Sequence, residues 1–277
     1  MNVGNAQLSP PPAGTYEIPV PKYKLPGEPE HYRLSAGRLG AARREPPTAL
    51  VHFWFRTRYV SAFAADLSNL HPHIFKLHIR PSIVARVIGS CVGLLPAFAQ
   101  SWIRTTALPE WFLPDHVVVK QQRQAKEMDE EEIMAEHFDN EVRAYRRLKP
   151  LQGVVVPTCY GRLNYYGTRA LLLEYLDGVS LSDPEGATLR LEELSNLLQP
   201  CYRALLALDV SHEDPNLSNF QLVNGKIMVM DLEEVEYGLS ADDKVHAMVM
   251  NIRELAGRYR SMQAYYRHDG SLEADEE

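Results

Sequence analysis

The sequence has few cysteines, and they lie far apart. Cys91, Cys159 and Cys201 form no CxxC pair, and an odd number of scattered cysteines is poor material for a disulfide framework. The N-terminal stretch MNVGNAQLSPPPAG has neither the basic start nor the apolar core of a signal peptide. Both absences favour a reducing compartment, and we expect a cytoplasmic protein.

Long apolar runs and clusters of basic residues are also missing. The least polar run, residues 87–99, contains Pro96 and is shorter than the roughly 20 residues that a helix needs to cross a bilayer. With a net charge of -7 and no long Lys/Arg run, the chain lacks the cationic face that binding to nucleic acid requires. We therefore expect neither a membrane nor a nucleic acid as partner, and the oligomeric state stays open.

The composition is that of a globular protein with unusual ends. The 277 residues, 45% of them hydrophobic, suffice for one large domain or two lobes with a sizeable core. Residues 1–47 are rich in proline, glycine and charge and have no sustained apolar period. This pattern predicts a Pro-rich arm that is mostly disordered or extended or, alternatively, a docking segment for a partner with a polyproline groove. Residues 269–277 form an acidic tail that we expect to be frayed.

The most informative stretch is residues 211–233. Asn219 follows Asp214 by five positions, and Asp231 comes twelve positions later. Between them, two short apolar runs flank Asn224-Gly225, the dipeptide that best tolerates the positive φ angles of a type I′ turn. The pattern predicts a hairpin that brings Asn219 and Asp231 together. Two carboxylates and an amide make a hard oxygen site suited to Mg²⁺; the alternative is ordinary turn residues.

A buried lysine with an acidic partner is predicted upstream. Three consecutive valines before Lys120 indicate a strand buried on both faces, where a lysine is costly unless it is paired or binds a ligand. Residues 130–148 have helical periodicity, with an apolar stripe of Phe138, Val142, Tyr145 and Leu148. Glu141 lies beside this stripe and is angled toward the protein. The alternatives are a lysine that simply closes a strand and a surface glutamate that contacts Tyr145 or Arg146.

Other stretches predict the remaining elements. Residues 162–175 have the pattern of a hairpin whose second strand leads into Glu174. Leucines recur at helical spacing over residues 191–208. Ser240 is a plausible N-cap for a last helix that reaches about Tyr266.

Two stretches carry weaker patterns. His71, His73 and His78 could be metal ligands, but their alternation favours a strand with polar residues on one face. In residues 81–115, the glycine pair of GSCVG (residues 89–93) does not match the phosphate-binding pattern G-x-G-x-x-G. We favour a buried strand or helix there.

The stretch HED at residues 212–214, with Asn219, resembles the kinase catalytic loop H-R-D-x-x-x-x-N. The triplet that starts at Asp231, DLE, is similar to the magnesium-binding D-F-G, and VVVK ending at Lys120 is similar to V-A-I-K. Over roughly residues 117–236, the chain thus resembles the protein kinase-like superfamily. The resemblance is to its short, divergent members, such as fungal protein-kinase-like and aminoglycoside-phosphotransferase-like proteins.

This resemblance implies a fold and an activity. The fold class is α+β, a two-lobed protein kinase-like fold with a small antiparallel-sheet N-lobe over residues 48–173 and a reduced helical C-lobe over residues 174–268. The activity is an ATP-dependent phosphotransfer that moves the γ-phosphate to a hydroxyl acceptor, with Mg²⁺ as the metal. The acceptor is a small molecule or a protein, and the sequence does not separate the two.

The resemblance also implies residue roles. Asp214 is the catalytic base and Asn219 its catalytic companion, while Asn219 and Asp231 bind Mg²⁺. Lys120, held by Glu141, steadies the phosphates of ATP.

The stretch EYLDG at residues 174–178 resembles the hinge that joins the two kinase lobes, and this resemblance implies the contacts with the ATP base and ribose. Backbone groups of Glu174 and Leu176 pair with adenine, and Asp177 reaches a ribose hydroxyl. An ordinary strand-to-loop exit is the alternative.

Several positions depart from the kinase pattern. Glu213 replaces an arginine, Asn216 stands in place of a lysine or histidine, and Leu232-Glu233 replace Phe-Gly. No Gly-rich phosphate loop and no A-P-E motif is recognisable. These departures keep a second hypothesis open, a pseudokinase that acts as a nucleotide-binding or scaffold module without turnover.

Overall fold

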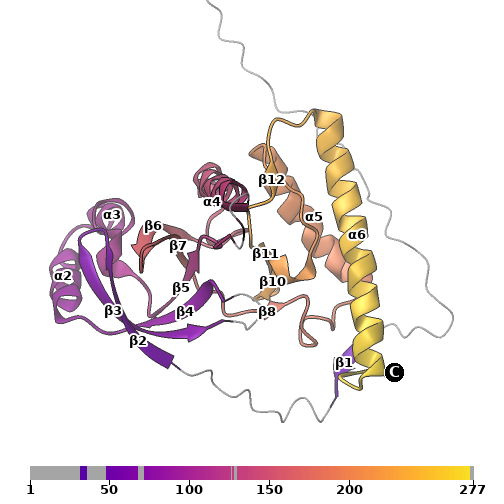
Figure 1. Cartoon of the computed structure of the whole chain (residues 1–277), viewed down its shortest axis with the longest axis horizontal. Helices are drawn as coiled ribbons and strands as arrows, with labels where there is room; N and C mark the ends of the chain where they lie inside the picture. The colour runs from indigo at the N-terminus through magenta and orange to yellow at the C-terminus, as the bar shows by residue number, and fades with distance from the viewer. Residues whose placement is uncertain (1–31, 36–47, 68–71, 126, 128–129, 275–277) are drawn as a thin grey trace, which may run out of the picture.

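The chain folds into a mixed α/β structure with a curled antiparallel sheet and several helices (Figure 1). The computed structural model describes residues 32–35, 48–67, 72–125, 127 and 130–274. Most of the predicted N-terminal arm, residues 275–277 of the tail, and His71 lie outside the described residues.

The largest sheet has six strands, and every neighbouring pair is antiparallel. In spatial order they are β2 (Thr48–Phe55), β3 (Arg58–Asp66), β4 (Ile74–Ile79), β5 (His116–Gln121), β7 (Thr168–Glu174) and β6 (Cys159–Tyr165). The predicted strand with His78 is β4, and the predicted hairpin over residues 162–175 is β6–β7. The ring of His78 contacts that of His116 on β5 in a tilted arrangement, with centroids 4.8 Å apart.

Strand β5 lies in the middle of this sheet and is buried on both faces, as the valine run predicts. Val117 and Val119 pack into one hydrophobic cluster with Phe55, and Val118 faces the other cluster with Phe138. A central strand with apolar neighbours on both faces has little freedom to move. It is therefore a rigid support for Lys120, which lies in the same strand directly after Val119.

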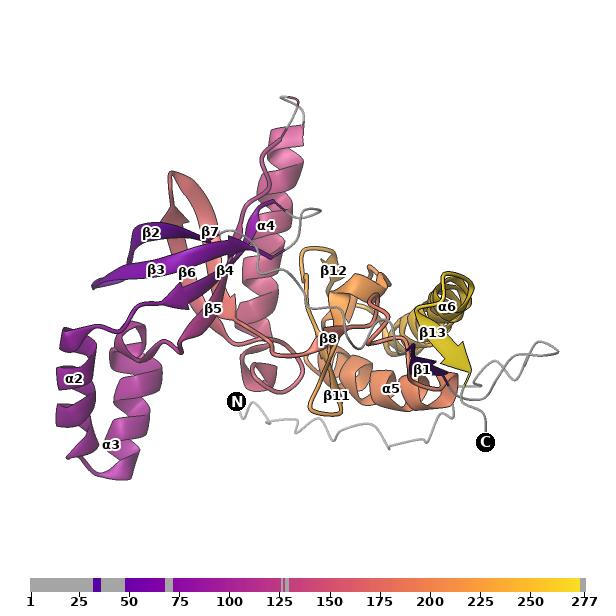
Figure 2. The ribbon, with the colours of Figure 1, turned by 90° about the horizontal axis from the view of Figure 1, so that it is seen from below.

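Helix α4 (Glu130–Arg147) covers one face of the sheet (Figures 1 and 2). Its predicted apolar stripe is buried, and the stripe ends at Leu148, just past the helix. Three glutamates in the first turn complement the positive end of the helix dipole.

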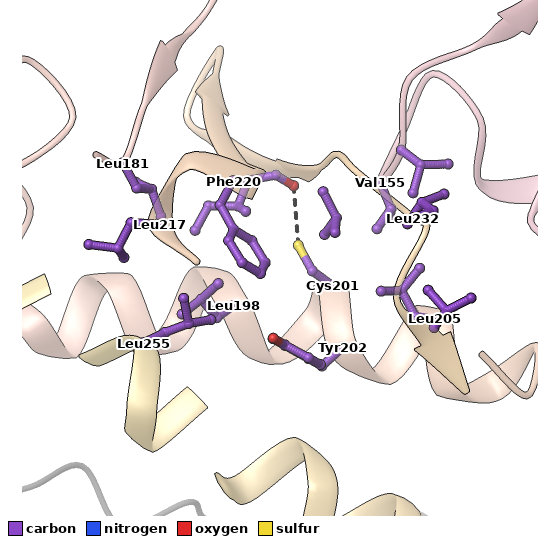
Figure 3. Close-up of a cluster of buried hydrophobic side chains, with 14 of the residues drawn as sticks. Val155, Leu181, Leu198, Cys201, Tyr202, Leu205, Leu217, Phe220, Leu232 and Leu255 are labelled. Atoms are coloured by element: carbon purple, nitrogen blue, oxygen red, sulfur yellow. Dashed lines mark hydrogen bonds between the residues drawn. The ribbon is translucent and has the colours of Figure 1, made fainter. Parts of the chain in front are cut away.

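In the C-terminal part, two long helices lie around a second set of short strands. The helices are α5 (Leu191–Ala207) and α6 (Ala241–His268). The short strands are β8 (Val179–Ser180), β9 (Ser211–His212), β10 (Phe220–Val223), β11 (Lys226–Val229) and β12 (Val235–Glu236). Figure 3 shows the core between α5 and the β10–β11 hairpin, where Phe220 and Tyr202 meet. The Sγ–H of Cys201 donates to the carbonyl of Ile227 at 3.2 Å, which ties the hairpin to α5.

Short parts of both ends of the chain form strands, and our expectation of a frayed tail was wrong at residues 272–274. Strand β1 (Tyr32–Leu34) pairs with β13 (Leu272–Ala274) beside the end of α6 (Figure 1). Tyr32 and Leu272 are buried in the large core cluster. Apolar burial and strand pairing outweigh the polar composition of the surrounding sequence.

The region between β4 and β5 is helical, and its two α-helices are largely exposed. It contains α2 (Ile83–Gly93), α3 (Ala97–Trp102), the π-helical turn η1 (Ile103–Ala107) and the 3-10 turn η2 (Pro109–Phe112). A helix was one of our two expectations, whereas its burial was wrong, since Val92 alone is buried in α2. A Cβ atom placed on Gly89 or Gly93 would meet open space, so these glycines do not form a close-fitting cradle.

Candidate functional site

Lys120 forms a buried ion pair with Glu141. Its Nζ atom lies 2.9 Å from each of the two carboxylate oxygens of Glu141. Strand β5 supplies the lysine and α4 supplies the glutamate, one residue before the buried Val142. The structure thus brings together two of the residues that the sequence paired.

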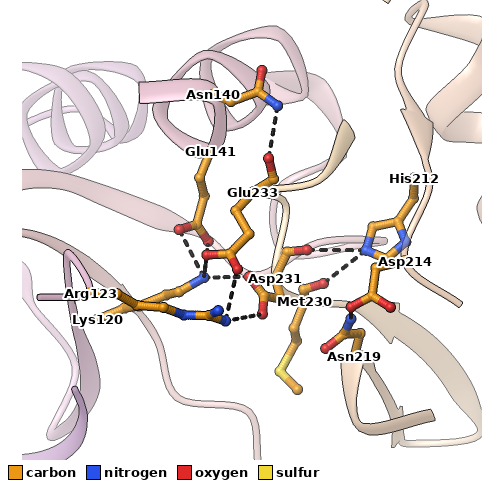
Figure 4. A network of polar contacts seen from close by, with 10 residues as sticks. All are labelled: Lys120, Arg123, Asn140, Glu141, His212, Asp214, Asn219, Met230, Asp231 and Glu233. Carbon is orange, nitrogen blue, oxygen red and sulfur yellow. Dashed lines mark hydrogen bonds and ion pairs between the residues drawn. The ribbon is translucent and has the colours of Figure 1, made fainter. Parts of the chain in front are cut away.

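A second carboxylate lies even closer to the lysine. Oδ1 of Asp231 is 2.6 Å from Lys120 Nζ, and Glu233 approaches the same atom at 3.8 Å. Arg123 completes the group, with Nη2 2.8 Å from Glu233 and 3.6 Å from Asp231 (Figure 4). Three acidic and two basic side chains therefore converge from β5, α4 and the segment after β11.

These contacts perturb the proton affinities of the cluster. Burial alone would lower the pKa of Lys120, but the carboxylates of Glu141, Asp231 and Glu233 outweigh it and raise that pKa. Burial would raise the pKa of Asp231, but Lys120 outweighs it and holds that pKa below its usual value. For Glu141 and Glu233, burial dominates and raises the pKa. The protein therefore keeps Lys120 charged and Asp231 ionised.

The hairpin that the sequence predicts positions the polar residues at its mouth. Phe220 faces Val229 in the β10–β11 register, and Asn224 and Gly225 have φ angles of 49° and 74°, as a type I′ turn requires. At the open end, the N–H of Met230 donates to the carbonyl of Asn219 at 2.7 Å. Asn219 and the residue before Asp231 are thus joined directly through the backbone.

Asp214 and Asn219 contact each other through their side chains. Nδ2 of Asn219 donates to Oδ2 of Asp214 at 2.7 Å (Figure 4). The intervening residues form a tight 3-10 turn, η4 (Leu217–Asn219), which the side chain of Asn216 caps by accepting from the N–H of Ser218. This turn fixes the orientation of the carboxylate and the amide relative to each other.

His212 holds the two acidic segments together. Its Nε2 lies 3.1 Å from the carbonyl of Asp231 and 3.3 Å from that of Met230. Since a carbonyl only accepts, Nε2 carries the proton. Burial lowers the pKa of His212 and favours its neutral form. Asn251 on α6 donates to the carbonyl of His212 at 2.8 Å, so the last helix helps to hold the backbone of His212 in place.

The backbone at Asp231 has an unusual conformation. Its φ angle of 54° lies in the left-handed region, which is uncommon for residues other than glycine, asparagine and aspartate. Such geometry persists when surrounding contacts determine it, here the carbonyl bond to His212 and the ion pair with Lys120.

The predicted adenine and ribose contacts lie at the end of β7. Glu174 pairs in register with Val117 on β5, and its side chain accepts from the N–H of Thr158 at 2.8 Å. Leu176 is buried and Asp177 is exposed. Within the described residues, Glu174, Leu176 and Asp177 take no part in the ion pairs around Lys120.

Arg123 and Glu233 are site residues that the sequence did not assign. Glu233 was noted as a departure from D-F-G, and its position two residues after Asp231 was the available signal. Arg123 carried no such signal, because it follows β5 in a segment without periodicity.

The acidic residues of the cluster suit a hard cation. Glu141, Asp231 and Glu233 each offer an oxygen, and these atoms lie within 4.8 Å of one another. Carboxylate oxygens are ligands that Mg²⁺ accepts. This trio shares Asp231 with the predicted pair of Asn219 and Asp231, and Lys120 and Arg123 compete with any cation for the same oxygens.

Comparison with known proteins adds no relative: neither a family model nor a curated protein sequence matches the chain.

Proposed function

We propose that this chain is an ATP-dependent phosphotransferase with a two-lobed protein kinase-like fold, which transfers the γ-phosphate to a hydroxyl acceptor. The observation that carries the proposal is the buried ion pair of Lys120 with Glu141, formed within 2.6 Å of Asp231. Buried charges are expensive, and strongly perturbed groups gather at functional sites.

The phosphate end of the site consists of the charged cluster. Lys120, oriented by Glu141, holds phosphate oxygens with the ammonium proton that contacts Asp231 in the free protein. Asp231 and Asn219 would hold Mg²⁺, and Glu233 lies near enough to Asp231 to add an oxygen. When bound there, the ion would supply positive charge against the phosphates.

The acceptor end is the loop with Asp214. The amide of Asn219 orients its carboxylate, which takes the proton of the attacking hydroxyl. A wide, open hollow lies beside this loop, between Asn216, Leu217 and the face of α6 with Glu254, Arg258 and Tyr265. Asp214 is not among the residues that line it, so the hollow does not by itself choose between a small-molecule and a protein acceptor.

The nucleotide base is assigned to the segment after β7. Backbone groups of Glu174 and Leu176 bind adenine, and Asp177 is exposed where a ribose hydroxyl would be met. Backbone pairing needs no particular side chain, so the support for this assignment is the resemblance of residues 174–178 to the kinase hinge.

A second candidate is a pseudokinase that binds nucleotide or a partner without turnover. Its specific support is that Lys120 and Arg123 already neutralise the carboxylates, and the cavity next to them measures about 10 Å³, which is the size of one water site. ATP then has to displace side chains to enter.

Turnover of ATP by the wild type and by Asp214→Ala tests the enzyme. Proton transfer by a positioned side chain contributes about 10²- to 10⁴-fold, so we expect a loss in that range. Asp139→Asn, an exposed change on α4, is the matched control. Unchanged turnover in Asp214→Ala would remove the catalytic-base assignment.

Calorimetry of ATP with Mg²⁺ separates the two candidates. If the wild type binds ATP with Mg²⁺ and Asp231→Asn does not, the nucleotide lies at the charged cluster around Lys120. Such binding without turnover on a broad panel of acceptors favours a nucleotide-binding pseudokinase. No binding to the folded wild type contradicts the enzyme and the nucleotide-binding module, and leaves the pseudokinase only as a scaffold for a partner.

A further inference from the structure

The chain segment that connects β4 to β5 contains helices α2 and α3. They form a hairpin that projects from the sheet. It lies at the end of the molecule farthest from α6 (Figures 1 and 2). Apart from Val92 in α2, the two helices have no buried residue. We call residues 83–107 the α2–α3 hairpin. The hairpin plays no part in the site built around Lys120.

The hairpin exposes an unusual amount of apolar surface. Leu94 is 88% exposed, Phe98 is 79% exposed and Trp102 is 60% exposed. Further exposed apolar residues of α2 are Ile83, Val84 and Val87. Single exposed apolar residues are ordinary, whereas a contiguous set marks a surface that another body covers.

The exposure is not a result of loose structure. The side chain of Gln100 closes the turn between the helices by donating to the carbonyls of Gly93, at 3.2 Å, and Leu95, at 2.7 Å. Ser82 caps α2 by accepting from the N–H of Ala85. The apolar tip is therefore held in a defined shape.

The base of the hairpin is fixed to the sheet. The buried carboxylate of Glu110 accepts from the hydroxyl of Thr57 at 2.6 Å, and the backbone carbonyl of Glu110 accepts from Arg58 at 2.9 Å. Thr57 lies in the β2–β3 turn and Arg58 opens β3, so the hairpin is attached to the sheet as a rigid projection.

The charge of the region points to the kind of body that covers it. No acidic residue occurs between Asp66 and Glu110, although the whole chain has a net charge of -7. Within the hairpin, Arg86 and Arg104 are both exposed. A rigid apolar tip flanked by cations is complementary to a surface that is negatively charged outside and apolar inside.

We propose that the α2–α3 hairpin anchors this protein in the interface of a bilayer that contains anionic lipids. Leu94 and Phe98 at the tip enter the acyl region, Trp102 lies at the headgroup level, and Arg86 and Arg104 contact lipid phosphates. Interfacial insertion reaches about 5–10 Å and needs no helix of spanning length. Our sequence-based expectation of no membrane partner considered only spanning segments.

A vesicle sedimentation experiment on the full chain tests the anchor. The probes are vesicles of phosphatidylcholine with 30% phosphatidylserine and vesicles of phosphatidylcholine alone. The test variants are the double changes Leu94→Asp with Phe98→Asp, and Arg86→Glu with Arg104→Glu. Met250→Glu, an exposed apolar position on α6, is the matched control. Because all these positions are exposed, the fold is retained.

We expect the wild type to bind the anionic vesicles and to lose binding in high salt. The apolar double variant binds at least tenfold more weakly, the arginine double variant loses the preference for phosphatidylserine, and Met250→Glu behaves as the wild type. A polarity-sensitive fluorophore on the exposed Cys91 shifts to the blue when anionic vesicles are added.

Two kinds of result would overturn the anchor. One is the absence of vesicle binding, or binding that the hairpin variants leave unchanged. The other is a wild-type oligomer that Leu94→Asp with Phe98→Asp converts to monomers, which would mean that a second copy of the chain covers the hairpin.

Discussion

The ammonium of Lys120 lies 2.6 Å from Oδ1 of Asp231, closer than the 2.9 Å that separates it from Glu141. The same carboxylate is the one oxygen donor shared by the predicted Mg²⁺ pair and the acidic trio around the lysine. Lys120 and a metal ion therefore compete for Asp231, unless a phosphate gives the lysine a new partner.

The first prediction is that Mg²⁺ and ATP bind cooperatively. Phosphate oxygens draw Lys120 away from Asp231, which frees the carboxylate for the metal. We expect Mg²⁺ to bind at least about tenfold more tightly with a non-hydrolysable ATP analogue present, a coupling of about 1.4 kcal/mol. Calorimetric titration of Mg²⁺ with and without the analogue measures this factor, after subtraction of Mg²⁺ binding to the analogue itself. Equal affinities would contradict the competition for Asp231.

The second prediction concerns the stability of the buried cluster. Lys120→Met removes the central cation and leaves Glu141, Asp231 and Glu233 facing one another in a buried site. Breaking a buried pair in this way costs about 3–5 kcal/mol. Urea unfolding at pH 8 measures the loss. Lys244→Met is the control, because it breaks a partly exposed pair with Asp209 and should cost about 1 kcal/mol or less.

The cost of Lys120→Met depends on pH in a defined direction. Without the lysine, the pKa of Glu141, already raised by burial, rises further. A carboxyl whose pKa is higher in the folded state contributes stability below its unfolded pKa and loses it as pH rises through the folded pKa. The difference between wild type and variant should therefore shrink between pH 8 and pH 5. A difference that stays constant would mean that the variant acts through packing alone.

The local features of the site could be predicted from the sequence. The turn at Asn224-Gly225 follows from the φ preference of two residues, and the orientation of Glu141 follows from helical spacing relative to Phe138 and Val142. These are short-range regularities. They were enough to predict the hairpin and the inward orientation of Glu141, the partner of Lys120. The resemblance to kinases placed Lys120 and Asp231 in one site, but it did not predict the direct contact of 2.6 Å between them.

Features that depend on distant contacts could not be predicted. The pairing of Tyr32–Leu34 with Leu272–Ala274 joins the two ends of the chain, and no local pattern encodes it. The apolar sequence of α2 indicates burial, but whether another element covers a helix depends on the whole fold. Arg123 enters the cluster for the same reason, since its partners come from another part of the chain.

The third prediction uses two glycines with opposite surroundings. A Cβ atom on Gly186 would lie 2.0 Å from the backbone oxygen of Ser180, so the chain has to shift, whereas one on Gly257 in α6 meets nothing within 4 Å. We expect Gly186→Ala to destabilise the protein by about 1–3 kcal/mol or more. Gly257→Ala should stabilise it by about 0.5–1 kcal/mol, because alanine loses less backbone entropy in a helix. Thermal unfolding measures the stability change of each variant. If both variants changed stability in the same direction, the close packing of Gly186 against Ser180 would be contradicted.

The last prediction is that one of the three cysteines reacts in the native protein. Cys91 is exposed on α2, whereas burial raises the pKa of Cys159 to about 12 and that of Cys201 to about 11. At pH 8, a thiol with a pKa of about 11 has roughly one thousandth of its molecules as the reactive thiolate. Cys201 is further restrained, because its Sγ–H donates to the carbonyls of Leu197 and Ile227.

Labelling with a maleimide at pH 8, followed by mass measurement, should therefore add one group to the folded chain and three in denaturant. Cys91→Ser should show no label under native conditions. Rapid native labelling of Cys201 would mean that α5 separates from the β10–β11 hairpin on the timescale of the reaction. Since that hairpin positions Asn219 and Asp231, such opening would also disassemble the candidate site, and the labelling rate would then fall when ATP and Mg²⁺ bind.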